Sequence, residues 1–312
     1  MVATIHSQLF FRRMTSTPIL HIGYPKTATT TLQNLLFARH HQIRLVGKPW
    51  SSRKVEEWAT LIYGCDSLEY DSKLAQRGYD EHVGQHLNKS DIVVVSVELF
   101  CLPQHADRGL IANRLKEISK EATIIVCIRE QLDYLPSFYR QQLGKHYTPS
   151  SFDNWIEASW NNRVNGTLHH LEYDKLVSCY QQLFGADSVH VFLYEQLRDD
   201  PVTFIGKLCC TLGIPPEEGI QLIGNDRENV ARTLNEVRYN HLRRVILPNL
   251  SLKKYVPNLL RRYFLDSLKR GQKHRLEIPH RWQKLLRERY RQSNLTLVEK
   301  TGLPLKEYGY CL

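Results

Sequence analysis

The sequence has 312 residues, a length that permits one large domain or two small ones around a sizeable core. Hydrophobic residues make up 42% and charged residues 24%, which excludes a disordered chain, a collagen-like repeat and a disulfide-stapled miniprotein. The formal net charge of +10 favours an anionic partner, a class that includes nucleic acid, a membrane surface, an acidic polymer and phosphate-bearing small molecules.

Strands and helices alternate along the first two thirds of the chain. Four apolar runs are nearly continuous, which is typical of strands covered on both faces. They occupy residues 18–22, 92–97, 123–128 and 189–194. Helical periodicity occupies residues 30–40, 52–63, 108–120, 132–145, 152–160 and 171–184. This order predicts an α/β fold with a central parallel sheet flanked by helices.

The C-terminal quarter has a different pattern. From residue 228 onward no strand signal remains, and apolar residues recur at helical spacing. The predicted helices there are 230–247, 255–269 and 278–300. We expect a single domain with three parts, namely an N-terminal tail (1–17), an α/β core (18–227) and a helical C-terminal part (228–312). Residues 44–90 are polar and mixed, and only the helix at 52–63 is predicted among them.

The cysteines and the apolar runs bear on the cellular location. The seven cysteines form no CxxC pair, and an odd number cannot all be bridged within one chain. The apolar run at 9–11 is too short for a signal peptide, and no run approaches the ~20 residues of a membrane span. We therefore expect a cytoplasmic protein without a membrane anchor.

The most informative segment, HIGYPKTATTTLQ (21–33), joins the first strand to the first helix. Unpaired backbone N–H groups and the helix dipole make such a helix start an anion site. Gly23 allows the backbone to turn, Lys26 supplies a positive charge, and several threonines supply hydroxyl donors. The segment therefore predicts a phosphate-binding loop.

This loop differs from the Walker A loop of nucleotide triphosphatases. A Walker A loop is longer and has a second glycine directly before its lysine. The strand at 92–97 also lacks the terminal acidic residue that helps to hold magnesium in those proteins, because Glu98 lies beyond it. A P-loop phosphotransferase such as a small-molecule kinase is therefore the second hypothesis. A non-catalytic protein that binds anions or nucleic acid is the third.

Segments along the whole chain resemble the sulfotransferases that use 3′-phosphoadenosine 5′-phosphosulfate (PAPS). GYPKTATTTLQ (23–33) resembles their 5′-phosphosulfate loop, and REQLDYLPSFYRQ (129–141) resembles their 3′-phosphate site. LYEQLRDDPVTFIGKLCCTLGI (193–214) and LRERYRQSNLTLVEKTGLPLKEYGY (286–310) resemble two later segments of the family. The late R-K-G nucleotide motif of the steroid and phenol enzymes is absent, so the resemblance is closer to bacterial and carbohydrate-type members.

The resemblance implies a P-loop-like three-layer fold and a set of nucleotide-binding residues. PAPS would be the sulfuryl donor and adenosine 3′,5′-bisphosphate (PAP) the product, with no metal. The 5′-phosphosulfate would lie on Gly23, Tyr24, Pro25, Lys26, Thr27, Ala28, Thr29, Thr30 and Thr31. The 3′-phosphate would lie on Arg129 and Ser137, because a guanidinium donates two parallel hydrogen bonds to a phosphate. The alternative is that Arg129 forms an ion pair with Glu130 or Asp133 and that Ser137 caps a helix.

Three residues are candidates for the chemistry of sulfuryl transfer. Negative charge grows on the oxygen that bridges sulfur and the 5′-phosphate, and Lys26 is expected to stabilise it. The acceptor must lose a proton, and Glu98, just past a strand, is the candidate base. His105 in the next loop is the competing base, since imidazole titrates near neutrality. Glu98 has a structural alternative, in which it bonds loop amides or Arg108. His21 is expected to be a core histidine.

The acceptor is expected to be a hydroxyl or amine on a glycan, a lipid-linked sugar or another small molecule. Residues 44–90 and 145–170 are expected to line its site.

Residues 238–291 contain 16 Lys and Arg against 3 Asp and Glu, so the positive charge of the chain belongs to this segment. As charge runs on helices are usually solvated and no nucleic-acid motif appears, we expect no nucleic-acid partner. We expect this segment to cover the acceptor site. The sequence does not predict the oligomeric state.

Overall fold

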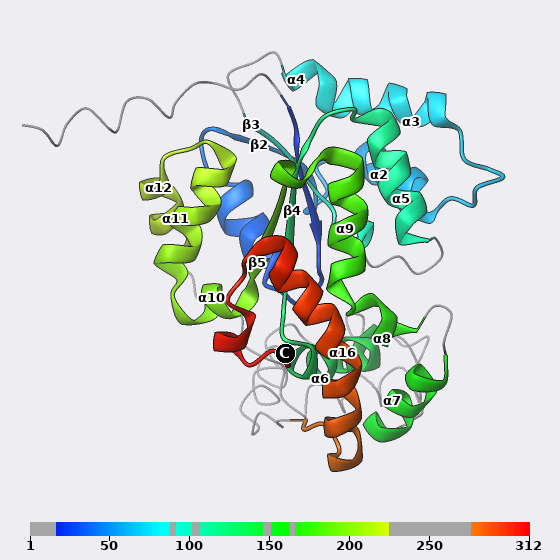
Figure 1. Cartoon of the computed structure of the whole chain (residues 1–312). Helices are drawn as coiled ribbons and strands as arrows, with labels where there is room; N and C mark the ends of the chain where they lie inside the picture. The colour runs from blue at the N-terminus through cyan, green and yellow to red at the C-terminus, as the bar shows by residue number, and fades with distance from the viewer. Residues whose placement is uncertain (1–16, 88–91, 102–106, 146–150, 163–165, 225–275) are drawn as a thin grey trace, which may run out of the picture.

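The computed structural model describes residues 17–87, 92–101, 107–145, 151–162, 166–224 and 276–312. At its centre lies a five-stranded, all-parallel sheet with the order β2-β3-β1-β4-β5 (Figure 1). The strands are β1 (Ile19–Gly23), β2 (Ile43–Gly47), β3 (Ile92–Ser96), β4 (Thr123–Ile128) and β5 (Val189–Leu193). The predicted α/β class is confirmed.

Helices connect the strands and cover both faces of the sheet (Figure 1). Before β3 they are α1 (Thr29–Thr31), the π-helical η1 (Leu32–Phe37), α2 (Arg53–Gly64), α3 (Ser72–Tyr79), the π-helical η2 (Asp80–Gly84) and α4 (Gln85–Leu87). Between β3 and β5 they are η3 (Glu98–Phe100), α5 (Arg108–Ile118), α6 (Gln131–Lys145), α7 (Phe152–Asn161), α8 (Thr167–His170), α9 (Tyr173–Phe184) and η4 (Ala186–Ser188). After β5 they are α10 (Tyr194–Asp199), α11 (Pro201–Leu212), α12 (Pro216–Gly224), α16 (His280–Thr301) and η5 (Leu305–Tyr308).

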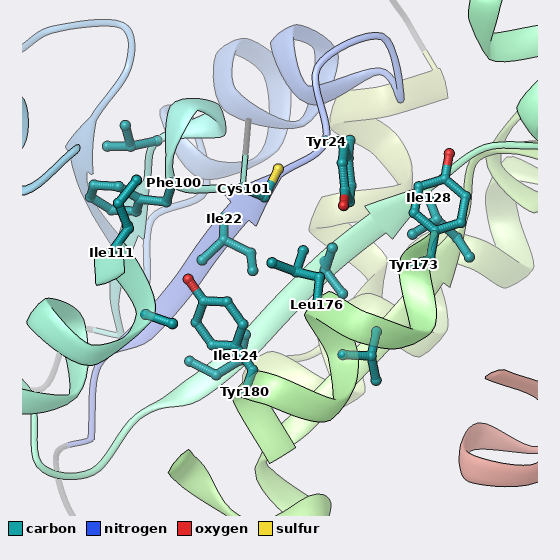
Figure 2. Close-up of a cluster of buried hydrophobic side chains, with 14 of the residues drawn as sticks. Ile22, Tyr24, Phe100, Cys101, Ile111, Ile124, Ile128, Tyr173, Leu176 and Tyr180 are labelled. Carbon is teal, nitrogen blue, oxygen red and sulfur yellow. The ribbon is translucent and has the colours of Figure 1, made fainter. Parts of the chain in front are cut away.

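Two hydrophobic cores lie on opposite faces of the sheet because successive strand residues point to opposite sides. Leu20 and Ile22 of β1 face α2, α5 and α9, whereas Ile19 faces η1, α11 and α12. In Figure 2, Leu176 and Tyr180 of α9 lie beside the strands of the first core. Burying one such side chain stabilises the fold by roughly 1.5–3 kcal/mol.

The strand order places β1 where the chain changes direction across the sheet. From β1 the chain moves out to β2, returns to β3 beside β1, and then crosses to β4 and β5 on the other side. In open α/β sheets, ligands bind beyond the carboxyl ends of the strands at such a point. The residues that follow β1 are those of the predicted phosphate loop.

Two differences from the expected elements lie in the first part of the chain. The four predicted strands are present, as are the predicted helices that fall within the described residues, and their ends differ from the prediction by at most three residues. The strand β2 and the helices from α3 to α4, in the segment around residues 44–90, were not predicted. Because β2 is an edge strand with an exposed Arg44 and half-buried neighbours, its sequence lacks the continuous apolar run of a central strand.

In the C-terminal part, α16 confirms the helix predicted at 278–300 and packs against α9 and α6. Its Asn294 accepts a hydrogen bond of 2.7 Å from Gln131, the first residue of α6. The helices predicted at 230–247 and 255–269 lie outside the described residues, as does most of the basic segment. Within the described residues, no helix is both long enough and apolar enough to cross a membrane.

Candidate active site

The carboxyl ends of the five strands form one edge of the sheet, and polar residues follow each strand there. We call this the carboxyl edge. In spatial order from β2 to β5, the residues that follow the strands are Lys48, Glu98, the loop 24–28, Arg129 and Tyr194. A row that includes three cationic residues, counting Lys26 of the loop, favours an anionic ligand.

The loop after β1 has the backbone of an anion cradle. Lys26 and Ala28 adopt left-handed conformations, with φ angles of 68° and 61°. Such conformations are costly for residues other than glycine and turn neighbouring N–H groups toward a common point. Gly23 has a φ of 125°, and a Cβ there would lie 2.6 Å from the sulfur of Cys101 and 2.9 Å from the carbonyl oxygen of Glu98. Glycine therefore allows the end of β1 to approach η3.

The loop threonines divide between internal support and the open side of the site. The buried Thr27 hydroxyl donates to the carbonyl oxygen of Tyr24 at 2.6 Å and so closes the loop on itself. In this structure its hydroxyl thus supports the loop. Thr30 is exposed, Thr31 is half-buried, and Pro25 is buried.

Tyr24 anchors the loop to the helical layer. Its ring is fully buried, its hydroxyl donates to the carbonyl oxygen of His170 at 2.7 Å, and Arg108 donates to the same hydroxyl at 3.0 Å. Burial raises the pKa of Tyr24. Figure 2 shows its ring near the end of β1, close to Tyr173, and the two ring centroids are 5.1 Å apart. Arg108 is therefore a partner of Tyr24, and not the partner of Glu98 that the sequence suggested as an alternative.

Glu98 lies beside the loop, where the sequence predicted a base. One carboxylate oxygen accepts from the Thr29 hydroxyl at 3.1 Å, and the other accepts from the Lys48 ammonium at 3.3 Å. The Glu98 side chain is 16% exposed. Lys48 was not predicted from the sequence because β2 was not predicted. The available signal was a short run of alternating apolar and polar residues that ends in Gly47 and is followed directly by a lysine. His105, the competing base, lies outside the described residues.

Arg129 lies on the other side of the loop and is bound to it. Its Nη1 donates to the carbonyl oxygen of Lys26 at 3.2 Å, and its guanidinium lies 4.4 Å from the centroid of the Tyr194 ring. Nε and Nη2 both donate to one oxygen of Asp133, at 2.9 and 2.6 Å. The predicted alternative, an ion pair with Asp133, is thus present, and the guanidinium is shared between that carboxylate and the loop carbonyl.

Helix α6 brings Ser137 to the same place. Asp133 and Ser137 are four residues apart on this helix and therefore lie on one face. Arg140 follows three residues after Ser137, and burial together with the nearby Arg129 lowers the pKa of Arg140. The structure thus gathers Arg129, Ser137 and Arg140 around one helix face. Sequence analysis missed Arg140, although its spacing from Ser137 was the available signal.

Two carboxyl groups, the half-buried Glu130 and the buried Glu195, support the end of β4 behind Arg129. Glu130 accepts from the backbone N–H of Asp133 at 2.7 Å and so caps the start of α6. Its own N–H donates to Glu195 at 2.9 Å, and the other oxygen of Glu195 accepts from the Tyr310 hydroxyl at 3.2 Å. Burial raises the pKa of Glu130 to about 7 and also raises that of Glu195. Glu130 therefore serves the helix start, and Asp133 is the carboxylate that pairs with Arg129.

His21 is a core residue, as predicted. It is fully buried in β1, and its Nδ1 lies 2.7 Å from the hydroxyl of Ser96, which also accepts from Gln33 at 2.9 Å. Burial lowers the pKa of His21 to about 4, so the ring is neutral at physiological pH.

The seven cysteines are free thiols; Cys209 is buried in the second core and Cys210 is exposed.

Among the described residues, one cluster has the side chains of a metal site. His40, His41 and Glu218 present ligand atoms within 4.8 Å of one another. They lie in the turn before β2 and at the start of α12, near the amino ends of the strands and away from the carboxyl edge. The Nδ1 of His40 accepts from the N–H of Gln42 at 3.2 Å, and its Nε2 lies 3.5 Å from a carboxylate oxygen of Glu218.

Comparisons with known proteins bear on the family and the fold of this chain. Residues 16–275 match the family model of the sulfotransferase domain. The structure is similar to that of a sulfotransferase from Alicyclobacillus acidocaldarius, with a TM-score of 0.58 and 14% identity over 94% of this chain and 98% of that one. It is also similar to the sulfotransferase domain from the curacin biosynthetic pathway, with a TM-score of 0.43 and 14% identity over 70% of this chain and 81% of that one. No curated protein matches in sequence. The family match covers most of the chain, and this protein therefore belongs to the sulfotransferase domain family.

Proposed function

We propose that this sulfotransferase uses PAPS as donor and transfers its sulfuryl group to a hydroxyl or amine of a carbohydrate or small natural product. The observation that carries the proposal is the hydrogen bond of 3.2 Å from Arg129 to the carbonyl oxygen of Lys26. This hydrogen bond holds the cationic side chain of Arg129 next to the loop that carries the cationic Lys26. PAPS has two anionic ends on one nucleotide, a 5′-phosphosulfate and a 3′-phosphate, and the two sites match them.

The loop after β1 receives the 5′-phosphosulfate in this proposal. Its left-handed residues, Lys26 and Ala28, turn backbone N–H groups toward the anion, and the helical segment that starts at Thr29 adds its dipole. The Lys26 ammonium stabilises the charge that grows on the bridging oxygen as the bond between sulfur and that oxygen breaks. Rigid anchoring by Thr27 and Tyr24 favours catalysis because the donor groups need no reorganisation.

Arg129 and Ser137 bind the 3′-phosphate in this proposal. The Arg129 side chain is 14% exposed and stacks on Tyr194, so its guanidinium is held in place before the nucleotide arrives. The phosphate displaces or shares the contact with Asp133. A 3′-phosphate distinguishes PAPS from ATP and adenylyl sulfate, so this site selects the donor.

Glu98 acts on the acceptor in this proposal. Its carboxylate takes the proton of the acceptor while the acceptor oxygen or nitrogen attacks sulfur in line with the leaving 5′-phosphate. Its contact with Thr29 supports this role, because it holds the carboxylate beside the phosphate loop. The acceptor then lies over the ends of β2 and β3, on the side of the loop away from Arg129. His105 remains the competing base.

The test is the transfer of radiolabelled sulfate from PAPS in the presence of EDTA. A panel of sugars, lipid-linked sugars and phenolic or polyol natural products serves as acceptors, and mass spectrometry identifies the sulfated product. We expect transfer that Lys26→Ala abolishes. A kinase, the second hypothesis, would instead need magnesium and ATP, and a non-catalytic binding protein would transfer nothing. Failure to bind PAP would overturn the proposal.

The seven free thiols support a reducing compartment, and we propose that the protein works in the cytoplasm. Cell fractionation followed by immunoblotting tests this, and recovery of the protein only from an oxidising compartment would contradict it.

A further inference from the structure

Lys48 occupies a defined position at the end of β2, beside the candidate base. Its backbone N–H donates to the carbonyl oxygen of Ser96 at 3.0 Å, which fixes the end of β2 against β3. Its ammonium lies 3.3 Å from one oxygen of Glu98 and 5.8 Å from the centroid of the Trp50 ring. The ammonium is thus oriented by a carboxylate and an aromatic ring at the carboxyl edge.

This ion pair is poorly explained by stability alone. The Lys48 side chain is 25% exposed, and ion pairs with that degree of exposure contribute at most about 1 kcal/mol. The carboxylate of Glu98 is also bound on its other oxygen by Thr29, the first residue of the helical segment after the phosphate loop. A single carboxylate group therefore separates the ammonium from the helix start on which the phosphosulfate is proposed to bind.

We infer that Lys48 is a second catalytic cation, which Glu98 holds before the reaction and releases to the transferred sulfuryl group when Glu98 takes the proton of the acceptor. The inference rests on the proposed function. It assigns Lys48 to the non-bridging sulfuryl oxygens, whereas Lys26 serves the leaving oxygen. The position of β3 between β2 and β1 places Lys48 on the acceptor side of Glu98 and Lys26 on the nucleotide side.

The electrostatics of the pair connect the two events. In the resting site the negative carboxylate attracts the ammonium, and this attraction directs the Lys48 charge away from the sulfuryl group. During transfer the proton moves from the acceptor to Glu98, a bond forms between the acceptor atom and sulfur, and the bond from sulfur to the bridging oxygen breaks with its electron pair on that oxygen. Protonated Glu98 is neutral, so the ammonium then interacts chiefly with the sulfuryl oxygens.

The test separates a contact with the sulfuryl group from support of the fold. We compare Lys48→Met, Lys48→Arg and the control Lys54→Met by their kcat for sulfate transfer and their Kd for PAP. Lys54 is an exposed lysine on α2 whose ammonium lies 3.7 Å from Glu81. PAP lacks the sulfuryl group, so Lys48→Met should lower kcat by about 100-fold while the Kd for PAP stays within about twofold. Lys48→Arg should recover part of kcat, and Lys54→Met should match the wild type.

Two results would overturn the inference. One is a kcat of Lys48→Met within about twofold of the wild type. The other is a loss of PAP affinity as large as the loss of kcat, which would mark a structural role. Both results can be told apart from a failure of the proposed function, because in that case the wild-type protein itself would transfer no sulfate from PAPS.

A double-mutant cycle tests the coupling between the two residues. If Glu98 releases Lys48 on protonation, Glu98→Gln removes part of the benefit of Lys48, so the double variant should lose clearly less kcat than the product of the two single losses. Losses that multiply fully would mean that the two residues act independently and would overturn the release step.

Discussion

The two halves of the carboxyl edge are built differently. On the half formed by β1, β4 and β5, which we call the donor side, functional groups bind backbone carbonyls of the loop: Thr27 donates to that of Tyr24, and Arg129, which also pairs with Asp133, donates to that of Lys26. On the half formed by β2 and β3, the acceptor side, Lys48 and Glu98 are held by side-chain contacts, with each other and, for Glu98, with Thr29.

This difference fits the two ligands. A nucleotide donor has a fixed shape, so preorganised backbone and guanidinium groups suit it. The acceptor side has to let a proton move, so side chains that change partners suit it better. Substitution of Arg129 on the donor side should therefore affect binding of the nucleotide, whereas substitutions of the residues that take part in the transfer step, Lys26 and those of the acceptor side, should affect turnover.

The largest effect is expected on the donor side, from Lys26→Met. Loss of the ammonium at the bridging oxygen should lower kcat for sulfate transfer by roughly 1,000-fold. Transfer of labelled sulfate from PAPS measures it, with Lys54→Met as the control. A variant that keeps more than a tenth of wild-type activity would remove Lys26 from the chemical step.

On the acceptor side, Glu98→Gln should lower kcat by about 100-fold, because the amide keeps the shape and the contact with Thr29 but cannot take a proton. The Kd for PAP, measured by calorimetry, should stay within about twofold of the wild type. If turnover is unaffected, the base lies elsewhere and His105→Ala becomes the variant of interest. If PAP binding weakens as much as turnover, the contrast between the two sides fails.

Arg129→Ala should give the opposite pattern. Losing a charged donor to the 3′-phosphate should weaken PAP binding by roughly 1.5–3 kcal/mol, while binding of AMP, which has no 3′-phosphate, should change little. Calorimetric titrations with both nucleotides provide the measurement, and Arg39→Ala, an exposed arginine of the turn after η1, is the control. An equal loss for both nucleotides would place Arg129 outside the 3′-phosphate site.

The smallest effect concerns stability on the donor side. Burial raises the pKa of Glu130 from 4.5 to about 7, so between these values the folded state keeps a proton that the unfolded state loses. Its contribution to stability is therefore present below pH 4.5 and is lost as the pH rises to 7. Relative to Glu130→Gln, the free energy of unfolding of the wild type should fall by about 1 kcal/mol between pH 5 and pH 8, after allowance for partial exposure. Urea titrations at the two pH values measure it, and a difference that does not change with pH would disprove the assignment.

The donor side was largely predictable from the sequence. Lys26 and Arg129 follow the central strands β1 and β4, whose continuous apolar runs mark their own ends, so the positions of these two residues followed from the pattern. The contacts made within it were not predictable. Nothing in the sequence indicates that the Thr27 hydroxyl closes the loop or that Tyr194 lies under the guanidinium, because both depend on how the loop and β5 approach each other.

The acceptor side was only half predictable. Glu98 follows the central strand β3 and was found, whereas Lys48 follows the edge strand β2 and was missed. An edge strand exposes part of its surface, as Arg44 does, and its sequence then resembles that of a loop. The sequence shows no more of the acceptor because the segments expected to line its site, 44–90 and 145–170, carry no motif specific to one acceptor class.

The use of PAPS is tested most directly by the affinities of the wild-type protein for PAP and AMP, measured by calorimetry in EDTA. PAP should bind at least tenfold more tightly than AMP, because Arg129 and Ser137 would bind a phosphate that AMP lacks. Equal affinities for the two nucleotides, or no binding of PAP, would contradict the assignment of the carboxyl edge as a PAPS site.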